Sequence, residues 1–180
     1  MNKLIKILLI ADIIWFFGEG MLGPLFAVFT GRVGGDVLDI TWAWASYLII
    51  TGLLIVVVGK VSDRIGQKKL VFTGYVLNAI LTFSYLLVDS PLKLLFVQAG
   101  LGIAAALATP TWDALYSKYE NKKEAGYVWG LSDGLSEFLT GIAIIIGGLI
   151  VTYFSFTTLF LTMGIIQILS VVCLFNIFRK

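Results

Sequence analysis

Six long apolar runs constrain the fold of this chain more than any other feature of its sequence. Each run has about 20 residues or more, the length of α-helix that crosses the hydrocarbon core of a membrane. Backbone groups in lipid must satisfy their own hydrogen bonds, so the runs are expected to be helical. The composition agrees, because 59% of the 180 residues are hydrophobic and 13% are charged. The sequence therefore predicts an all-α integral membrane protein with one domain, 1–180, and six transmembrane helices near 4–29, 41–59, 70–88, 92–117, 127–152 and 157–178.

The basic residues predict the orientation of these spans. Lys and Arg next to a span are retained on the cytoplasmic side. If the N-terminus is cytoplasmic, the outside segments hold Arg32 and Lys93 alone, and the inside segments hold Lys3, Lys6, Lys60, Arg64, Lys68, Lys69, Lys118, Lys122, Lys123, Arg179 and Lys180. We therefore expect both termini to be cytoplasmic, in the inner membrane of a bacterial or archaeal cell. The first run is too long for a signal peptide and carries two acidic residues, so it is expected to be kept as a helix.

The chain has no histidine and one cysteine, Cys173. A disulfide within one chain is therefore impossible, and zinc sites and His-based catalytic dyads lack their usual ligands. We expect the protein not to be an enzyme and to use no cofactor and no metal. A nucleic-acid partner is not expected either.

A short hydrophilic stretch, residues 59–69, joins the second and third predicted spans. Its glycines allow a sharp turn where two helices end, and its cations hold the segment on the cytoplasmic side. An aspartate among those cations indicates a salt-bridged latch rather than a plain solvated loop. The stretch fits the pattern G-x-x-x-[DE]-[RK]-x-G-x-[RK]-[RK] at its six defined positions, which are Gly59, Asp63, Arg64, Gly66, Lys68 and Lys69.

This motif resembles the loop between the second and third helices of the major facilitator superfamily of transporters. The resemblance covers the whole chain and implies one six-helix half, of the N-terminal type, of a fold that usually has twelve spans. It implies that Asp63 takes part in gating by capping the positive N-terminus of the fifth helix in the facing half. Arg64 matches the cation that follows in the family, with Asp113 as its candidate anionic partner.

Two prolines predict an internal repeat. Pro24 and Pro110 lie late in the first and fourth spans, and each follows a glycine-rich stretch. A proline removes one helical hydrogen bond and should kink or loosen its helix. Matching breaks in two three-helix segments are typical of inverted repeats with a binding site near the breaks.

Five acidic residues lie inside the predicted spans, where a charge costs roughly 2.5–3.5 kcal/mol on insertion scales. They are Asp12, Glu19, Asp113, Asp133 and Glu137, and no Lys or Arg lies at comparable depth. Such carboxylates must be protonated, paired with polar groups or neutralised by a cation. They favour proton coupling, a cationic or amphiphilic solute, or both.

Helical periodicity and the family resemblance together indicate which residues line a cavity. In the superfamily, the first and fourth helices line the central cavity, and the second and fifth meet the other half. The candidates for a substrate or proton cavity are Asp12, Glu19, Gln98, Thr109, Trp112 and Glu137. For the three residues on the fourth helix, contacts between helices or anchoring at the membrane interface are the alternative. Asp12 lies nearer the inner surface, where simple hydration would explain it.

A stripe of small residues on the fifth helix predicts a contact with another helix. Its members fall within about 40° of each other around the helix, which lets a neighbour approach closely. They are Gly130, Gly134, Gly141 and Gly148. The halves of the superfamily fold are related by an axis along the membrane normal, so a second copy of the chain could supply the missing half as a parallel two-fold homodimer. In that arrangement Asp63 would lie near residues 126–129 of the second copy.

The sequence therefore predicts a secondary active transporter of a small solute, working by alternating access as a homodimer of half-transporters, with proton coupling as a hypothesis. Its expected partners are the lipid bilayer, a second copy of itself, a small-molecule substrate and protons. One alternative is an N-terminal fragment of a twelve-helix transporter, against which the ending at Arg179-Lys180 without a linker is the one indication. The other is a non-transporting membrane scaffold subunit with the same fold.

Overall fold

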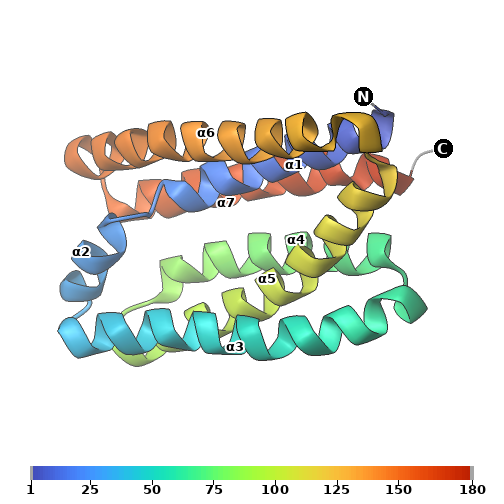
Figure 1. Cartoon of the computed structure of the whole chain (residues 1–180). Helices are drawn as coiled ribbons and strands as arrows, with labels where there is room; N and C mark the ends of the chain where they lie inside the picture. The colour runs from blue at the N-terminus through green and yellow to red at the C-terminus, as the bar shows by residue number, and fades with distance from the viewer. Residues whose placement is uncertain (1, 179–180) are drawn as a thin grey trace.

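A computed structural model describes residues 2–178, and in this range the regular elements are helices (Figure 1). In chain order they are α1 (Lys3–Gly20), α2 (Leu25–Arg32), α3 (Val37–Ile65), α4 (Gln67–Ser84), η1 (Tyr85–Leu87), α5 (Pro91–Tyr119), η2 (Lys122–Glu124), α6 (Ala125–Tyr153), α7 (Phe156–Phe175) and η3 (Asn176–Phe178). Five segments of this range are long and apolar enough to cross a membrane: α3, α4 with η1, α5, η2 with α6, and α7 with η3.

The span predicted near 4–29 differs most from a continuous helix. α1 ends at Gly20, and α2 begins at Leu25 with Pro24 as its N-cap residue. Gly23, in the turn between them, has φ +25°, which disfavours a residue with a side chain. The interruption therefore lies where the proline was expected to loosen the helix. Four of the 18 residues of α1 are charged, and for this reason α1 is not among the five segments named above.

The predicted charged connector between the second and third spans is almost entirely helical. α3 continues through Ile65, and α4 begins at Gln67, so Gly66 alone separates the two helices. Gly66 has φ +104°, a conformation that favours glycine, and its N–H donates to Ser62 O. Gly59 lies inside α3, so the expectation that it serves the turn is wrong.

The long helices form two groups that lie one above the other in Figure 1. In one group α1 packs against α6 and α7, and in the other α5 packs against α3 and α4. The contact between α4 and α7 is the main one that joins the two groups. The α4–α5 contact is close at Gly74, because a Cβ there would lie 2.8 Å from both Ala104 O and Ala108 N.

Two aromatic-rich clusters form the core. One contains Phe29, Tyr85 and Phe160, and the rings of Tyr85 and Phe160 stack with their centroids 5.0 Å apart. The other contains Trp112 and Tyr116, which stack at 4.4 Å. These clusters pack toward opposite ends of the bundle and hold the two helix groups in a defined relation.

α3 and α6 bury the smallest part of their surface inside the chain. In their most apolar stretches 6% of the α3 residues and 17% of the α6 residues are buried, against 39–50% for α4, α5 and α7. In a membrane these two faces can meet lipid or another protein.

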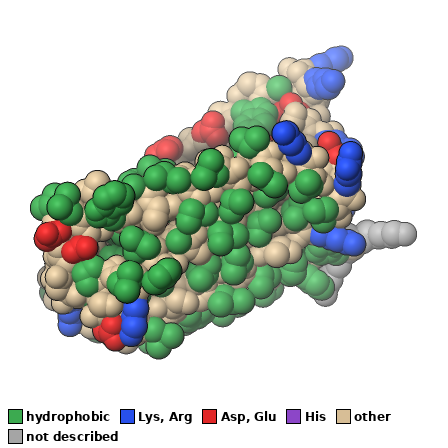
Figure 2. Space-filling model, turned by 90° about the horizontal axis from the view of Figure 1, so that it is seen from below, with side chains coloured by type: hydrophobic (Ala, Val, Ile, Leu, Met, Phe, Trp, Pro, Cys, Tyr) green, Lys and Arg blue, Asp and Glu red, His purple; other side chains and the backbone are tan. Residues whose placement is uncertain are grey.

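The described residues near both chain ends lie at one end of the bundle, where α3 meets α4 and α5 meets α6 (Figure 1). Figure 2 shows a long hydrophobic belt on one face of the molecule, with most of the Lys and Arg side chains of that face at one end. At the opposite end Lys93 Nζ donates to Asp89 Oδ2 at 2.6 Å. This hydrogen bond holds the pKa of Asp89 below its usual value.

Candidate functional site

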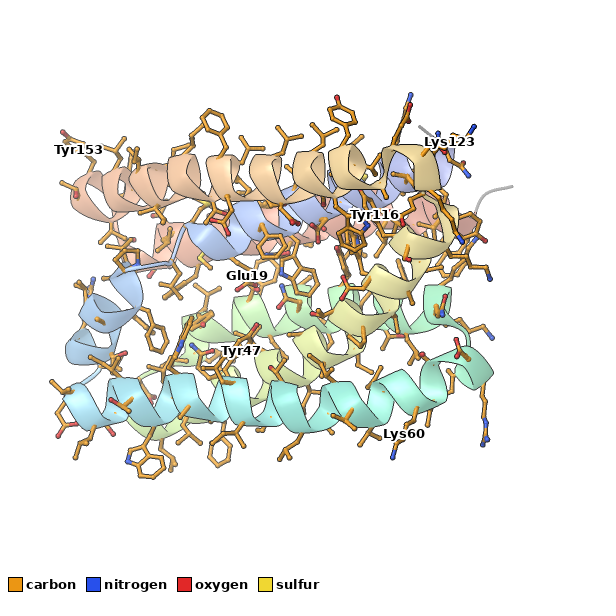
Figure 3. The ribbon with its side chains drawn as sticks, viewed as in Figure 1. Glu19, Tyr47, Lys60, Tyr116, Lys123 and Tyr153 are labelled. Atoms are coloured by element: carbon orange, nitrogen blue, oxygen red, sulfur yellow. The ribbon has the colours of Figure 1, made fainter. Side chains whose placement is uncertain are left out.

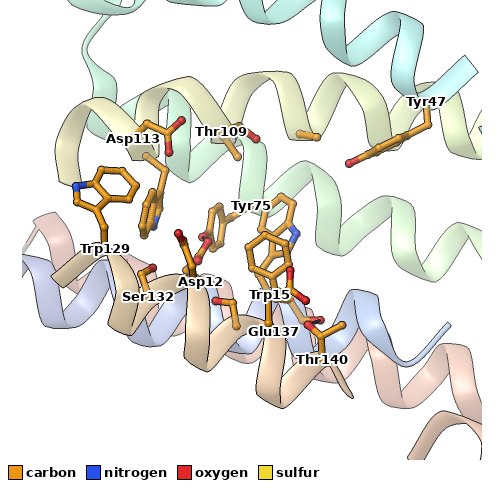
Figure 4. A pocket seen from close by; sticks show the side chains of 16 residues that line it. Asp12, Trp15, Tyr47, Tyr75, Thr109, Asp113, Trp129, Ser132, Glu137 and Thr140 are labelled. Carbon is orange, nitrogen blue, oxygen red and sulfur yellow. Dashed lines mark hydrogen bonds between the residues drawn. The ribbon is translucent and has the colours of Figure 1, made fainter. Parts of the chain in front are cut away.

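A cavity of about 280 Å³ lies between the two helix groups (Figure 4). Five helices contribute to it, namely α1, α3, α4, α5 and α6. Its lining comprises Asp12, Trp15, Phe16, Tyr47, Tyr75, Ala105, Ala108, Thr109, Trp112, Asp113, Trp129, Ser132, Asp133, Ser136, Glu137 and Thr140. The volume is close to the lower limit of about 300 Å³ that is usual for small-molecule sites.

Four carboxylates dominate the charge of this cavity. Asp12 comes from α1, Asp113 from α5, and Asp133 and Glu137 from α6. The lining contains no Lys or Arg among the described residues. The last three side chains are exposed, so the cavity opens to the surface of the chain. Within residues 2–178 these three carboxylates accept no hydrogen bond, whereas Asp12 Oδ1 accepts one from Tyr75 Oη at 3.4 Å.

Aromatic side chains form much of the cavity wall, and their own contacts hold them in place. Trp15 packs edge-on against Tyr75 with 4.3 Å between ring centroids. Trp112 donates through Nε1 to Leu8 O at 3.3 Å and packs edge-on against Trp129 at 5.9 Å. Faces of Trp and Tyr attract cations, so these walls and the carboxylates favour the same kind of ligand.

One hydroxyl in the lining has no partner. Ser136 is 8% exposed, and its Oγ is buried without a hydrogen bond. An unsatisfied buried hydroxyl is costly, and the Asp12 carboxylate lies close enough to Ser136 to influence it. The remaining hydrogen-bonding capacity of this oxygen can be met by a ligand or water in the cavity. Ser136 belongs to a polar face of α6 that recurs every three or four residues and also carries Trp129, Asp133, Glu137 and Thr140. The same 3.6-residue periodicity in the sequence could have identified this face, which lies beside the glycine stripe.

Three of the six cavity candidates from the sequence lie on α1 or α6 and three on α5, and the structure divides them differently. Asp12, Thr109, Trp112 and Glu137 line the cavity. Glu19 and Gln98 are not part of its lining. Gln98 is 3% exposed and packs inside the chain.

Glu19 joins three helices instead of facing the cavity. Its Oε1 accepts from Asn78 Nδ2 of α4 at 2.8 Å and from Gln167 Nε2 of α7 at 3.4 Å. Gln167 Nε2 also donates to Trp15 O of α1 at 3.1 Å. Figure 3 shows Glu19 between the two helix groups, with the label of Tyr47 below it in this view. The two amide donors explain how a carboxylate is accommodated at this depth.

The residues of the charged motif have separate roles in this structure. Asp63 Oδ1 accepts from Gln67 Nε2 at 2.9 Å, a contact between the end of α3 and the start of α4. Lys68 Nζ donates to Ile177 O at 2.9 Å and so holds the end of η3. Arg64 and Lys69 are exposed.

The predicted ion pair between Arg64 and Asp113 is not formed. Asp113 lines the cavity, and in the described part of the chain the one ion pair is Lys93 with Asp89. The reason is the length of α3, which carries Arg64 to the exposed end of its helix while Asp113 faces inward from α5.

The glycine stripe of α6 is unoccupied within the chain. Among the residues that the structure describes, no atom outside the helix lies within 4 Å of the place where a Cβ would stand at Gly130, Gly134, Gly141 or Gly148. Glu137 lies at the border between this stripe and the cavity, because it is three or four residues from Gly134 and Gly141. The open stripe and the cavity are therefore adjacent features of one side of the bundle.

The fold and the site together define a helical membrane protein with an acidic, aromatic cavity between two groups of helices. The chain belongs to the major facilitator superfamily, whose family model matches residues 8–180.

Two relatives illustrate the similarity. A protein described as an uncharacterized MFS-type transporter of Methanocaldococcus jannaschii is 23% identical over 172 residues, which are 96% of this chain and 45% of that protein. The multidrug resistance protein MdtG of Escherichia coli is 21% identical over 182 aligned positions, 99% of this chain and 45% of MdtG. The chain thus spans about half the length of the curated relatives it matches.

Proposed function

We propose that this chain is one six-helix half of a secondary active transporter, and that its cavity carries a small cationic or amphiphilic solute by alternating access. One observation carries the proposal: within residues 2–178 the cavity lining has four carboxylates and no Lys or Arg, and it opens to the surface. Carboxylates at membrane depth are tolerated where they line a watery cavity or meet a partner charge. The description of one relative as a multidrug resistance protein is in keeping with an amphiphilic solute.

The packing supports two inverted three-helix repeats, with α1 and α2 together as the first span. Exchange of α1 with α5, α3 with α6 and α4 with α7 turns the α1–α6 contact into the α5–α3 contact. The same exchange turns α1–α7 into α5–α4 and leaves α4–α7 unchanged. The main helix contacts of the chain therefore have the pseudo-symmetry expected of such repeats.

A second six-helix unit would complete the transporter, and we propose a second copy of this chain in a parallel two-fold arrangement. The support is the open glycine stripe of α6, the low burial of α3 and α6, and the cavity beside them. The alternative is that the remainder of a longer chain supplies the second unit, as the length of the relatives allows. Asp63 would cap α6 of the facing unit from the exposed end of α3.

Crosslinking in membranes tests whether two copies of the chain form the proposed homodimer. Val128 is unsuitable because it is 4% exposed, whereas its neighbour Tyr127 is 71% exposed. We expect Asp63→Cys with Tyr127→Cys, in a Cys173→Ala background, to give a disulfide-linked pair of chains. Asp63→Cys with Asp89→Cys is the control and should not crosslink, because Asp89 lies at the other end of the bundle. No crosslink with the first pair would contradict the homodimer.

Transport in proteoliposomes tests the function itself. We expect the chain to move a lipophilic monocation such as tetraphenylphosphonium in response to an imposed pH gradient. Glu137→Gln should lower the rate and flatten its dependence on pH, because it removes an unpaired carboxylate from the cavity. Asp89→Asn, outside the cavity, should leave both unchanged. An unaltered pH dependence in both Glu137→Gln and Glu19→Gln would exclude them as proton carriers.

A further inference from the structure

The arrangement of charge within the cavity is uneven, and this bears on the kind of cation that fits it. Asp12, Asp113 and Asp133 are close enough to repel one another electrostatically. Glu137 stands apart from this group, one helical turn or about 6 Å further along α6 than Asp133. One chain therefore presents two anionic positions, a group of three carboxylates and a single carboxylate, in the same cavity.

A metal ion does not suit this arrangement. Among residues 2–178, no three acidic or cysteine side chains come together in a way that could hold a metal. Aromatic rings form much of the cavity wall, and the cavity is much larger than one ion requires. An organic cation uses both features, because its ammonium groups pair with carboxylates and its carbon chain lies against aromatic rings.

The unpartnered hydroxyl of Ser136 distinguishes between classes of organic cation. Ser136 lies between Asp133 and Glu137 in the sequence and lines the same cavity. Its buried Oγ can accept a hydrogen bond from a primary ammonium group, which has three N–H donors. A quaternary ammonium has no N–H group and cannot donate to this oxygen.

We infer that the cavity binds an α,ω-diamine, with one ammonium at the group of three carboxylates and the other at Glu137. This inference rests on the proposed transport function and names its substrate class. A single positive charge would leave the second anionic position without a partner in a poorly solvated site. A four-carbon chain separates two amines by about one turn of helix, the spacing of Asp133 and Glu137. The volume of about 280 Å³ accommodates such a slender molecule.

Isothermal titration on the purified full chain tests the inference with 1,4-diaminobutane and 1-aminobutane. We expect the diamine to bind about tenfold more tightly than the monoamine, the effect of one additional charge pair. Glu137→Gln should bring the two affinities within about twofold of each other, and Asp133→Asn should reduce the ratio as well. Asp89→Asn is the matched control outside the cavity and should preserve the tenfold ratio. Circular dichroism and a melting curve establish that each variant is folded.

Two results would overturn the inference. One is equal affinity for the two amines in the unaltered chain, and the other is a diamine preference that survives both cavity substitutions. If Glu137→Gln fails to fold, the affinity ratio measured for Asp133→Asn alone decides whether the diamine preference depends on the cavity carboxylates. Transport of tetraphenylphosphonium separates this inference from the proposed function. If the chain transports the monocation but shows no preference for the diamine, the diamine inference alone is refuted. If the folded chain neither binds nor transports any cation, both the diamine inference and the proposed transport function are refuted.

Discussion

Asn78 Nδ2 donates to Glu19 Oε1 at 2.8 Å and thereby joins α4 to α1 across the two helix groups. Asn78 is 2% exposed and the second donor, Gln167, is 1% exposed, so both amides are removed from solvent. Glu19 also lies two residues before the turn that separates α1 from α2. The bond therefore fixes the end of α1 at the point where the first span is interrupted.

Removal of this bond should destabilise the bundle. We expect Asn78→Leu to cost about 1–3 kcal/mol, because Glu19 loses its shortest hydrogen bond while it stays away from water. Thermal unfolding in detergent measures the effect, and Thr73→Ala, at an exposed position on α4, is the control. The double change with Glu19→Leu should cost less than the sum of the two single changes, since they act on the same bond. Additive effects would contradict the proposed link.

A glycine that packs against a neighbouring helix should tolerate a side chain far less than a glycine with no neighbour near its Cα. Gly74→Leu is expected to destabilise the fold by about 1–3 kcal/mol or more, because its Cβ meets the backbone of α5. Gly134→Leu should leave the unfolding temperature of a single chain nearly unchanged, since no described atom lies within 4 Å of a Cβ at this position. If the stripe is the contact between two copies, size-exclusion chromatography in mild detergent should show less dimer for Gly134→Leu. An unaffected dimer would place the contact elsewhere.

Lys68 offers a test of the motif that does not involve transport. Its ammonium donates to Ile177 O, and Ile177 is 3% exposed. We expect Lys68→Met to release the end of α7 and η3, with a loss of about 1 kcal/mol and faster hydrogen exchange near residues 174–178. Lys69→Met, on the exposed neighbouring residue, should change neither. Equal exchange in both variants would show that the hydrogen bond does not hold this end.

The Lys93–Asp89 pair allows a pH measurement outside the membrane-spanning segments. Its hydrogen bond lowers the pKa of Asp89, so any stability that it contributes is present at neutral pH and is lost as the pH falls through the lowered value. Lys93→Met should return the pKa toward the usual range for aspartate, which a carbon-detected NMR titration would show. Both side chains are exposed, so the melting temperature should hardly change.

The sequence predicts the helices well because their signal is local. The length of each apolar run, Pro24 and the glycine at position 66 act through the backbone of their own segment. The ends of α3 were less predictable, since the charged residues after Gly59 are compatible with a helix that extends beyond the hydrocarbon. Composition alone does not separate such an extension from a loop.

The cavity of this structure and the candidate residues from the sequence differ because of tertiary packing. Asp12 and Glu19 share one face of α1, yet Asp12 meets the cavity and Glu19 meets Asn78 and Gln167. The neighbours of a helix face change along its length, and periodicity carries no information about which neighbour lies at which height. Helical periodicity could have identified the polar face of α6 around Ser136. It could not have identified the aromatic wall from Tyr47 and Tyr75, which depends on contacts between helices far apart in the sequence.

The start of α1 and the end of η3 lie at the same end of the bundle, and this has a consequence for how larger proteins can arise from this unit. Two copies joined head to tail would both keep their original direction across the bilayer, and the joining segment would remain on one side. A simple tandem gene fusion would thus yield a double-length chain without inverting either part. Such a fused chain, made in the laboratory, would also allow each of the two cavities to be altered separately.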